Sequence, residues 1–261
     1  MRHIYKNNPR INKDVTQGTI INNCVADKYS CEIWGVIVTP RCDLAHTGKV
    51  THVHYLPVIP FDEWYKVDGL EYLWTKALER NKKKLQAICN TKGFPTKRLN
   101  ENQLIELCDS LPDSQDKSKL KDIIDNLYRL ERSNPIEYNP NHDEKHRLIS
   151  NLRKGELPSF YLIEDWRDRN NYMVILLRDL KRLEYSVAMQ LSKGIEETSI
   201  KNQSRNDFLY SKSKELIYNS EAEIDSPYIE QLMERFSHNF CRIGVDDMNE
   251  DVENVLNSII E

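Results

Sequence analysis

The sequence predicts an α+β fold, in which a small, strongly bent or barrel-like, mainly antiparallel sheet carries a large helical insertion and C-terminal helices. Three observations predict it. Residues 17–61 read as strands, the apolar periodicity changes from about two to about 3.6 over residues 63–155, and strand character returns after Pro158. Because neither strand-rich piece has enough strands to bury a sheet face alone, we expect the two pieces to join in one sheet.

The first strand-rich piece contains three candidate strands, at residues 19–25, 31–39 and 50–59, in which β-branched and aromatic side chains dominate. Residues 33–38 are continuously apolar, as expected of a strand covered on both faces. The third strand alternates more clearly, which is typical of a strand with two different faces.

The middle of the chain has helical periodicity. Asn100 is a suitable N-cap for one helix, and Asp113 or Ser114 is suitable for the next. Polar residues 133–143 predict a surface loop, followed by a short helix to about Arg153. The apolar stripes of the first and third helices are, respectively, Leu70, Leu73, Trp74, Ala77 and Leu78, and Leu120, Ile123, Ile124, Leu127 and Leu130.

The second strand-rich piece predicts a hairpin, formed by residues 160–163 and 172–177 around a turn at 167–171. Residues 183–191 are ambiguous between strand and helix. The pattern then predicts a polar loop at residues 193–203 and a helix at residues 207–218.

Two helices are expected at the C-terminal end. Ser226 is a good N-cap, Pro227 fits the first helical position and Gly244 ends the helix. The apolar faces of this helix and of the final one are Tyr228, Leu232, Phe236 and Phe240, and Met248, Val252, Val255, Leu256 and Ile259. The predicted domains are a discontinuous α+β core domain and a helical insertion, residues 1–62 with 157–261 and residues 63–156.

Composition excludes several function classes. The 37 Lys and Arg residues against 41 Asp and Glu residues give a net charge of −4, so the whole chain has no electrostatic attraction to nucleic acid or anionic lipid. No apolar run is long enough to cross a bilayer, and residues 1–12 are too polar for a signal peptide, so we expect a cytoplasmic protein without membrane contact. Phosphate-loop, dinucleotide, serine-hydrolase and zincin motifs are absent.

Short segments at the two ends of the chain resemble a scattered group of bacterial proteins. Gln17–Gly18, residues 38–45 with the pattern Thr-Pro-x-Cys-Asp-Leu, and the Ser-Pro-Tyr sequence at residues 226–228 carry the resemblance. Thr19 departs from the acidic residue of the group's opening motif. The resemblance implies no established activity, and it implies gene neighbourhoods concerned with mobile elements or phage defence.

Arg41, Cys42, Asp43 and His46 form a candidate binding group after an apolar strand and a Thr-Pro turn. One hypothesis makes Cys42 a nucleophile or redox thiol, with Asp43 as an orienting carboxylate. The candidate bases are His46, His52 and His54. The alternative has Cys42 packed as a small hydrophobe and Asp43 capping the turn.

Cys24, Cys31, Cys42 and His46 could supply four zinc ligands, but their spacing is not that of two zinc knuckles. Ordinary core cysteines and a surface histidine explain the same residues. The six cysteines of the chain are expected to be free thiols, several of them buried.

A second catalytic hypothesis places Asp165, Asp179 and Lys181 around the hairpin. Two acids and a lysine in this arrangement are what a metal-dependent nuclease of the PD-(D/E)xK kind uses, with the acids holding Mg²⁺ and the lysine orienting water. The alternative is a solvated hairpin end in which Arg178 and Arg182 pair with nearby acids.

A basic edge is expected on the first inserted helix, formed by Arg80 and residues 82–84 and joined by Lys92, Lys97 and Arg98. It could contact phosphates of a nucleic acid, or it could be the solvated face of a helix, since acids such as Glu79 are interspersed.

Taken together, the residues favour a non-catalytic interaction or adaptor component of a bacterial multiprotein system, with the sheet as scaffold and the helical insertion as the surface for proteins encoded nearby. The nuclease, with Mg²⁺, and a zinc or thiol site at Cys42 are the alternatives.

Overall fold

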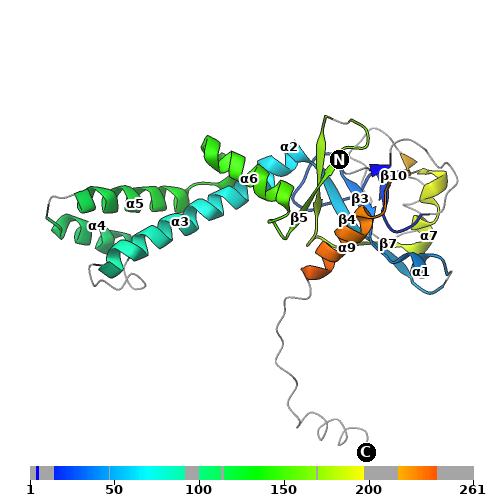
Figure 1. Ribbon diagram of the computed structural model, residues 1–261, viewed down its shortest axis with the longest axis horizontal. Helices are drawn as coiled ribbons and strands as arrows, with labels where there is room; N and C mark the ends of the chain where they lie inside the picture. The colour runs from blue at the N-terminus through cyan, green and yellow to red at the C-terminus, as the bar shows by residue number, and fades with distance from the viewer. Residues whose placement is uncertain are drawn as a thin grey trace, which may run out of the picture.

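The fold was analysed in a computed structural model, in which a curled sheet domain carries a projecting helical arm (Figure 1). The structure describes residues 4–5, 15–46, 48–91, 100–112, 115–168, 170–196 and 217–239.

The sheet unites both strand-rich pieces, as the sequence predicted. The order of its strands is β1-β10-β2-β3-β4-β6-β5, β7 pairs with β4 beside this path, and every pairing is antiparallel. The strands are β1 (Ile4–Tyr5), β2 (Thr19–Ile21), β3 (Trp34–Ile37), β4 (His52–Pro60), β5 (Phe160–Glu164), β6 (Tyr172–Leu176), β7 (Lys181–Glu184) and β10 (Ser220–Ile224).

The described helices lie between and after these strands. They are α1 (Arg41–Leu44), α2 (Phe61–Trp64), the π-helix η1 (Tyr65–Gly69), α3 (Leu70–Thr91), α4 (Glu101–Ser110), α5 (Gln115–Arg132), the 3₁₀ turn η3 (Pro135–Glu137), α6 (His142–Lys154), α7 (Tyr185–Ala188), the 3₁₀ turn η4 (Leu191–Lys193) and α9 (Tyr228–His238).

The nine-residue strand β4 explains why the sheet curls. Its C-terminal half pairs with β6, through Val58 opposite Ile175, and its N-terminal half pairs with β7, through Val53 opposite Leu183. Because β6 and β7 share β4, the sheet bends along it into a barrel-like half-cylinder, and the predicted α+β fold with a bent sheet is confirmed.

Side chains alternate between two cores on the two faces of the sheet, as strand geometry requires. The first core contains Ile37 and Tyr55 and is covered by α2, α6, α7 and the first turns of α3. The second core contains Val36 and Leu56 and is covered by α9, whose Ile229 is fully buried. Both faces of β3 are therefore buried, which agrees with the apolar run of residues 33–38.

Gly35 of β3 allows the first core to close around it. A Cβ at this position would lie 2.6 Å from Cδ2 of Tyr55 and 2.7 Å from Sγ of Cys24. Both distances are shorter than real side-chain contacts, so glycine lets the Tyr55 ring approach the strand.

The arm has a third core of its own, between the C-terminal half of α3, α4 and α5. Leu85, Leu104, Leu120 and Ile124 are buried in it. The predicted N-cap of α4 is confirmed, because Asn100 and Gln103 cap each other's backbone amides. The predicted insertion, residues 63–156, contributes to two cores, since Leu148 of α6 belongs to the first core and α5 to the third.

Two predictions near the C-terminal end are wrong. Ile217 and Tyr218 were expected in a helix but form β9 (Ile217–Tyr218), which pairs with β8 (Ile195–Glu196). Ser226 does not cap α9. The residue directly before this helix is Pro227, and the backbone carbonyl of Asp225 accepts hydrogen bonds from the first amides of the helix. β10 is a strand that the sequence did not predict.

Several predictions lie outside the described residues. They concern Asp113 and Ser114, residues 197–216, and Lys92, Lys97, Arg98, Phe240, Cys241, Gly244 and the helix with Met248, Val252, Val255, Leu256 and Ile259.

Candidate functional site

Cys42 lies on the short helix α1 with an exposed, free thiol, so it is not the packed hydrophobe of the alternative interpretation. Its Sγ is 3.6 Å from Oδ1 of Asp43, and Nζ of Lys49 is 2.5 Å from the same oxygen. The hydrogen bond from Lys49 lowers the pKa of the Asp43 carboxyl. No hydrogen bond joins Cys42 to a histidine among the described residues, so the structure does not assemble the proposed Cys-His pair.

The four residues considered for zinc are not brought together. Cys24 is fully buried beside Tyr55, and this burial raises the pKa of its thiol well above the ordinary value. Cys42, in contrast, is exposed on α1. Within the described part of the chain, which includes Cys31 and His46, no three His, Cys, Asp or Glu side chains form a group that could hold a metal ion.

The acids of the nuclease hypothesis lie at opposite ends of the hairpin. In the β5–β6 register, Glu164 pairs with Tyr172 at one end and Phe160 with Leu176 at the other. Asp165 follows the first end and Asp179 follows the second. Antiparallel pairing of five-residue strands therefore separates the two carboxylates by the length of the hairpin, which corrects the expectation that the turn would gather them.

Lys181 and Asp179 form an ion pair, with Nζ 3.0 Å from Oδ1, and Lys181 also binds Asp27 at 2.9 Å. Both carboxylates raise the pKa of Lys181 and outweigh the opposing effect of burial. This pairing holds the β6–β7 connection against the loop before β3, and it occupies the lysine that a nuclease would need to orient water.

Asp165 belongs to a buried polar cluster rather than to an open site. Arg167 binds it through two nitrogens, at 3.0 and 2.9 Å, and stacks 3.9 Å from the ring centroid of Trp34. The indole nitrogens of Trp34 and Trp166 both donate to Oε2 of Glu221, at 2.9 and 3.2 Å. Every member has a partner within the cluster, so it links β3, β10 and the end of β5 structurally.

The pKa values of the two carboxyls of this cluster are shifted in opposite directions. Burial acts to raise the pKa of Asp165, but hydrogen bonds from Arg167 outweigh it and lower that pKa. Burial raises the pKa of Glu221, and the hydrogen bonds from the two indoles oppose the rise without cancelling it.

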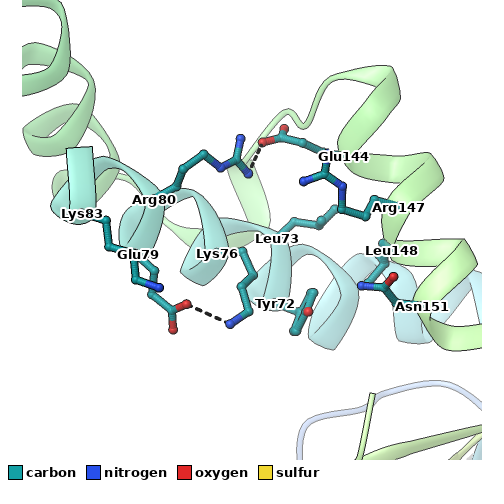
Figure 2. Close-up of a pocket in the computed structure, with 10 residues that line it drawn as sticks. All are labelled: Tyr72, Leu73, Lys76, Glu79, Arg80, Lys83, Glu144, Arg147, Leu148 and Asn151. Atoms are coloured by element: carbon teal, nitrogen blue, oxygen red, sulfur yellow. Dashed lines mark hydrogen bonds and ion pairs between the residues drawn. The ribbon is translucent and has the colours of Figure 1, made fainter. Parts of the chain in front are cut away.

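A basic groove lies between α3 and α6, where the arm leaves the sheet domain (Figure 2). Its volume is about 380 Å³. Ten residues line this groove: Tyr72, Leu73, Lys76, Glu79, Arg80, Lys83, Glu144, Arg147, Leu148 and Asn151.

Glu144 fixes the two walls of the basic groove relative to each other. Arg80 Nη2 lies 3.0 Å from its Oε1, and the Tyr138 hydroxyl donates to its Oε2 at 3.0 Å. Burial and this hydrogen bond raise the pKa of Tyr138 to about 12, so the phenol remains a donor at neutral pH. The same carboxylate completes the capping box of α6 with Asn141. One buried acid therefore both starts α6 and ties it to α3.

Two cations of the basic groove form no close ion pair within the described chain. Lys76 pairs with Glu79 at 2.8 Å, and Arg80 pairs with Glu144. Lys83 on α3 and Arg147 on α6 are left without an ion pair among the described residues. The groove therefore presents positive charge from both helices, which suits an anionic group that enters between them.

Sequence reasoning found one wall of this groove and missed the other. The predicted basic edge contains Arg80 and residues 82–84, all on α3, where Lys82 pairs with Glu131 on α5. Arg147 was missed because it belongs to a short, mainly charged helix. Its position directly before the buried Leu148 was the available signal, since a residue beside the apolar stripe lies at the edge of a packed helix face.

No family model matches the chain, and searches among curated proteins and among solved structures found no similar protein. No helix in the described ranges combines the length and apolar character needed to cross a membrane.

An apolar groove lies on the other side of α6, between that helix and β5. Its volume is about 490 Å³. Ile149 of α6 and Tyr172 of β6 line it and are 48% and 47% exposed, although both are large hydrophobic side chains. The remaining lining residues are Phe61, Leu152, Arg153, Leu162, Ile163 and Glu164. α6 thus separates a basic groove from an apolar one.

Proposed function

We propose that this chain is a non-catalytic adaptor of a bacterial multiprotein system, one concerned with phage defence as the sequence resemblance implies. Its sheet domain serves as the scaffold, and the arm with the basic groove at its base binds the partner. The observation that carries the proposal is a pair of cations, Lys83 and Arg147, that form no ion pair among the described residues and lie on the two helices that join the arm to the sheet domain.

The architecture supports a binding role for the arm. Its three helices pack around a separate core, and they project away from the sheet domain (Figure 1). An element that buries its own apolar residues does not need the rest of its surface for folding, so that surface is available for contact. The acids and bases along it disfavour a large apolar interface and favour a polar partner.

The basic groove supports an acidic protein segment as the partner's contacting part. A hollow of about 380 Å³ accommodates one or two side chains rather than a folded domain. A carboxylate there would receive charge-assisted hydrogen bonds from Lys83 or Arg147 without first breaking an ion pair between described residues. The net charge of −4 disfavours nucleic acid as a general partner, because the whole chain then has no electrostatic attraction to phosphates.

The test is co-expression of the full chain with the products of its neighbouring genes, followed by affinity measurement on any complex that co-purifies. The double substitution Lys83→Glu and Arg147→Glu is expected to weaken the complex at least about tenfold, because like charges then face the acidic segment. Raising the salt concentration is expected to weaken the wild-type complex more than the variant complex.

Lys84→Glu together with Lys145→Glu is the matched control. Both residues are exposed on the same two helices, α3 and α6, and neither lines the basic groove. Equal loss of affinity in the control and in the groove variant would assign binding to overall charge and contradict the proposal. A chain that binds none of the neighbouring products would contradict the adaptor role itself.

A further inference from the structure

We propose that the apolar groove between α6 and β5 is filled by the C-terminal segment of the same chain, residues 246–261. This inference goes beyond the proposed function, because it concerns a different groove and an occupant that the chain itself supplies. Four properties support it: the exposed apolar surface of the groove, the place where the chain leaves α9, the length of the segment and its sequence pattern.

The groove has the form of a site that another apolar surface should cover. Leu152 and Ile163 form its buried floor, at 1% and 3% exposure. Ile149 and Tyr172 stand at its margins with about half of their surface in solvent. Covering these two side chains would remove apolar area from water, at roughly 25 cal/mol per Å².

The end of α9 contacts the connection between α6 and β5, the two elements between which the groove lies. Arg235 Nη2 is 3.4 Å from the carbonyl oxygen of Lys154, which ends α6, and Asn239 Nδ2 donates to the carbonyl oxygen of Pro158 at 2.9 Å. Pro158 comes two residues before β5, which lines the groove. The chain therefore leaves α9 near the connection that joins the two walls of the groove.

The remaining chain is long enough to reach along the groove. Eight residues lie between Asn239 and Met248, and the nine Cα–Cα steps span at most about 30 Å when extended. The five residues of β5 extend over about 17 Å, so the connection reaches either end of the groove. A helix over residues 248–259 would be about 18 Å long, a length that matches β5.

The sequence of the segment fits the groove in both polarity and charge. Its apolar side chains recur at helical spacing, so a helix would present them on one face. Residues 246–261 contain six Asp and Glu residues and no Lys or Arg. Arg153 and Lys154 lie in the last turn of α6 beside the groove, and their charge complements these acids. The residues of this apolar face are Met248, Val252, Val255, Leu256 and Ile259.

Hydrogen–deuterium exchange of the full chain tests this proposal. In the wild type, the amides of residues 248–259 are expected to exchange at least about tenfold more slowly than those of an unstructured peptide. Ile149→Asp, at the margin of the groove, is expected to abolish this protection. The double substitution Val252→Asp and Leu256→Asp is expected to abolish it too and to speed exchange in β5.

Ile136→Asp is the matched control. Ile136 is also a large hydrophobic side chain, 61% exposed, and it lies in η3 outside the groove. The control is expected to leave the protection of residues 248–259 unchanged. Circular dichroism of each variant verifies that the fold itself is retained, and because Ile149 is half exposed, its substitution leaves the cores intact.

Three results would overturn the proposal. The first is exchange of residues 248–259 at the rate of an unstructured peptide in the wild type. The second is protection that Ile149→Asp does not change. The third is protection that depends on protein concentration and accompanies a dimer in light scattering, because the segment would then come from a second copy.

Discussion

The sheet domain and the helical arm solve the same problem, burying apolar side chains, by different means. In the sheet domain, β2 pairs with β10 and β4 pairs with β6 and β7, so the partners come from opposite ends of the chain. In the arm, α3, α4 and α5 follow one another and pack around a single separate core. The sheet domain thus depends on long-range pairing, whereas the arm depends on neighbours in the sequence.

This difference has consequences for where the chain tolerates charge. The sheet domain holds polar groups in hydrogen-bonded networks, such as Asp165 with Arg167 and Glu221 with two indoles. The ion pairs of the arm lie on its surface, where such pairs contribute little to stability. Binding surfaces can therefore change on the arm at small cost, whereas changes in the sheet domain disturb folding.

Removing a large core side chain is expected to have the largest effect on stability, and the size of the loss is expected to differ between the sheet domain and the arm. Trp64 of α2 is fully buried against Phe160, with ring centroids 5.1 Å apart, so Trp64→Ala is expected to lower the free energy of unfolding by about 3–5 kcal/mol. Ile124→Ala in the arm is expected to cost about 2–4 kcal/mol. Urea unfolding measures both values.

Amide exchange distinguishes where each loss acts. Ile124→Ala is expected to speed exchange in α4 and α5 and to leave β3 and β4 unchanged, because the core of the arm is separate. Equal acceleration in both regions would show that the arm and the sheet domain unfold as one unit, and the contrast between them would fail.

The polar cluster of the sheet domain predicts an intermediate effect that depends on pH. The pKa of Asp165 is lower in the folded than in the unfolded chain, so its stabilisation is present above the unfolded pKa and is lost as pH falls through the folded pKa. Asp165→Asn is expected to cost about 1–2 kcal/mol at pH 7, discounted for the 40% exposure of Arg167, and to reduce the loss of stability on acidification.

Glu221→Gln is expected to change the pH dependence of stability in the opposite direction. The folded pKa of Glu221 is raised, so its contribution is present below the unfolded pKa and is lost as pH rises through the folded pKa. The glutamine oxygen still accepts from the indoles, so the variant is expected to be at least as stable as the wild type at pH 7. Urea unfolding from pH 4 to pH 8 measures the free energy of unfolding of both variants. The same change with pH in both would refute the opposite pKa shifts of Asp165 and Glu221.

The smallest effect is expected at the N-cap of α4. Asn100→Ala removes the side chain that accepts from the Gln103 amide, and it is expected to cost about 1 kcal/mol. Because the arm depends on local structure, faster amide exchange should remain confined to α4. Spread of this effect into the sheet domain would weaken the distinction between the two regions.

Local patterns were sufficient for much of the fold. The β5–β6 hairpin, the Asn100 cap and the apolar face of α5 all depend on residues close together in the sequence, and all three are confirmed. β10 was missed because Ser220–Ile224 has few β-branched residues, and its strand conformation comes from pairing with β2. The Ser226 cap was wrong because a backbone carbonyl, which leaves no sequence signal, serves the amides instead.

The candidate site was predicted less completely than the fold, because it depends on distances between segments. The sequence alone determined the classes of element, the single sheet made from two pieces and the basic edge of α3, since periodicity and composition are local properties. Only the tertiary structure decided that Arg80 contacts Glu144, 64 residues further along, and that Arg147 therefore faces this edge. It also decided that Asp165 and Asp179 lie apart. Packing and strand register set those distances, and neither is encoded in the spacing of any one segment.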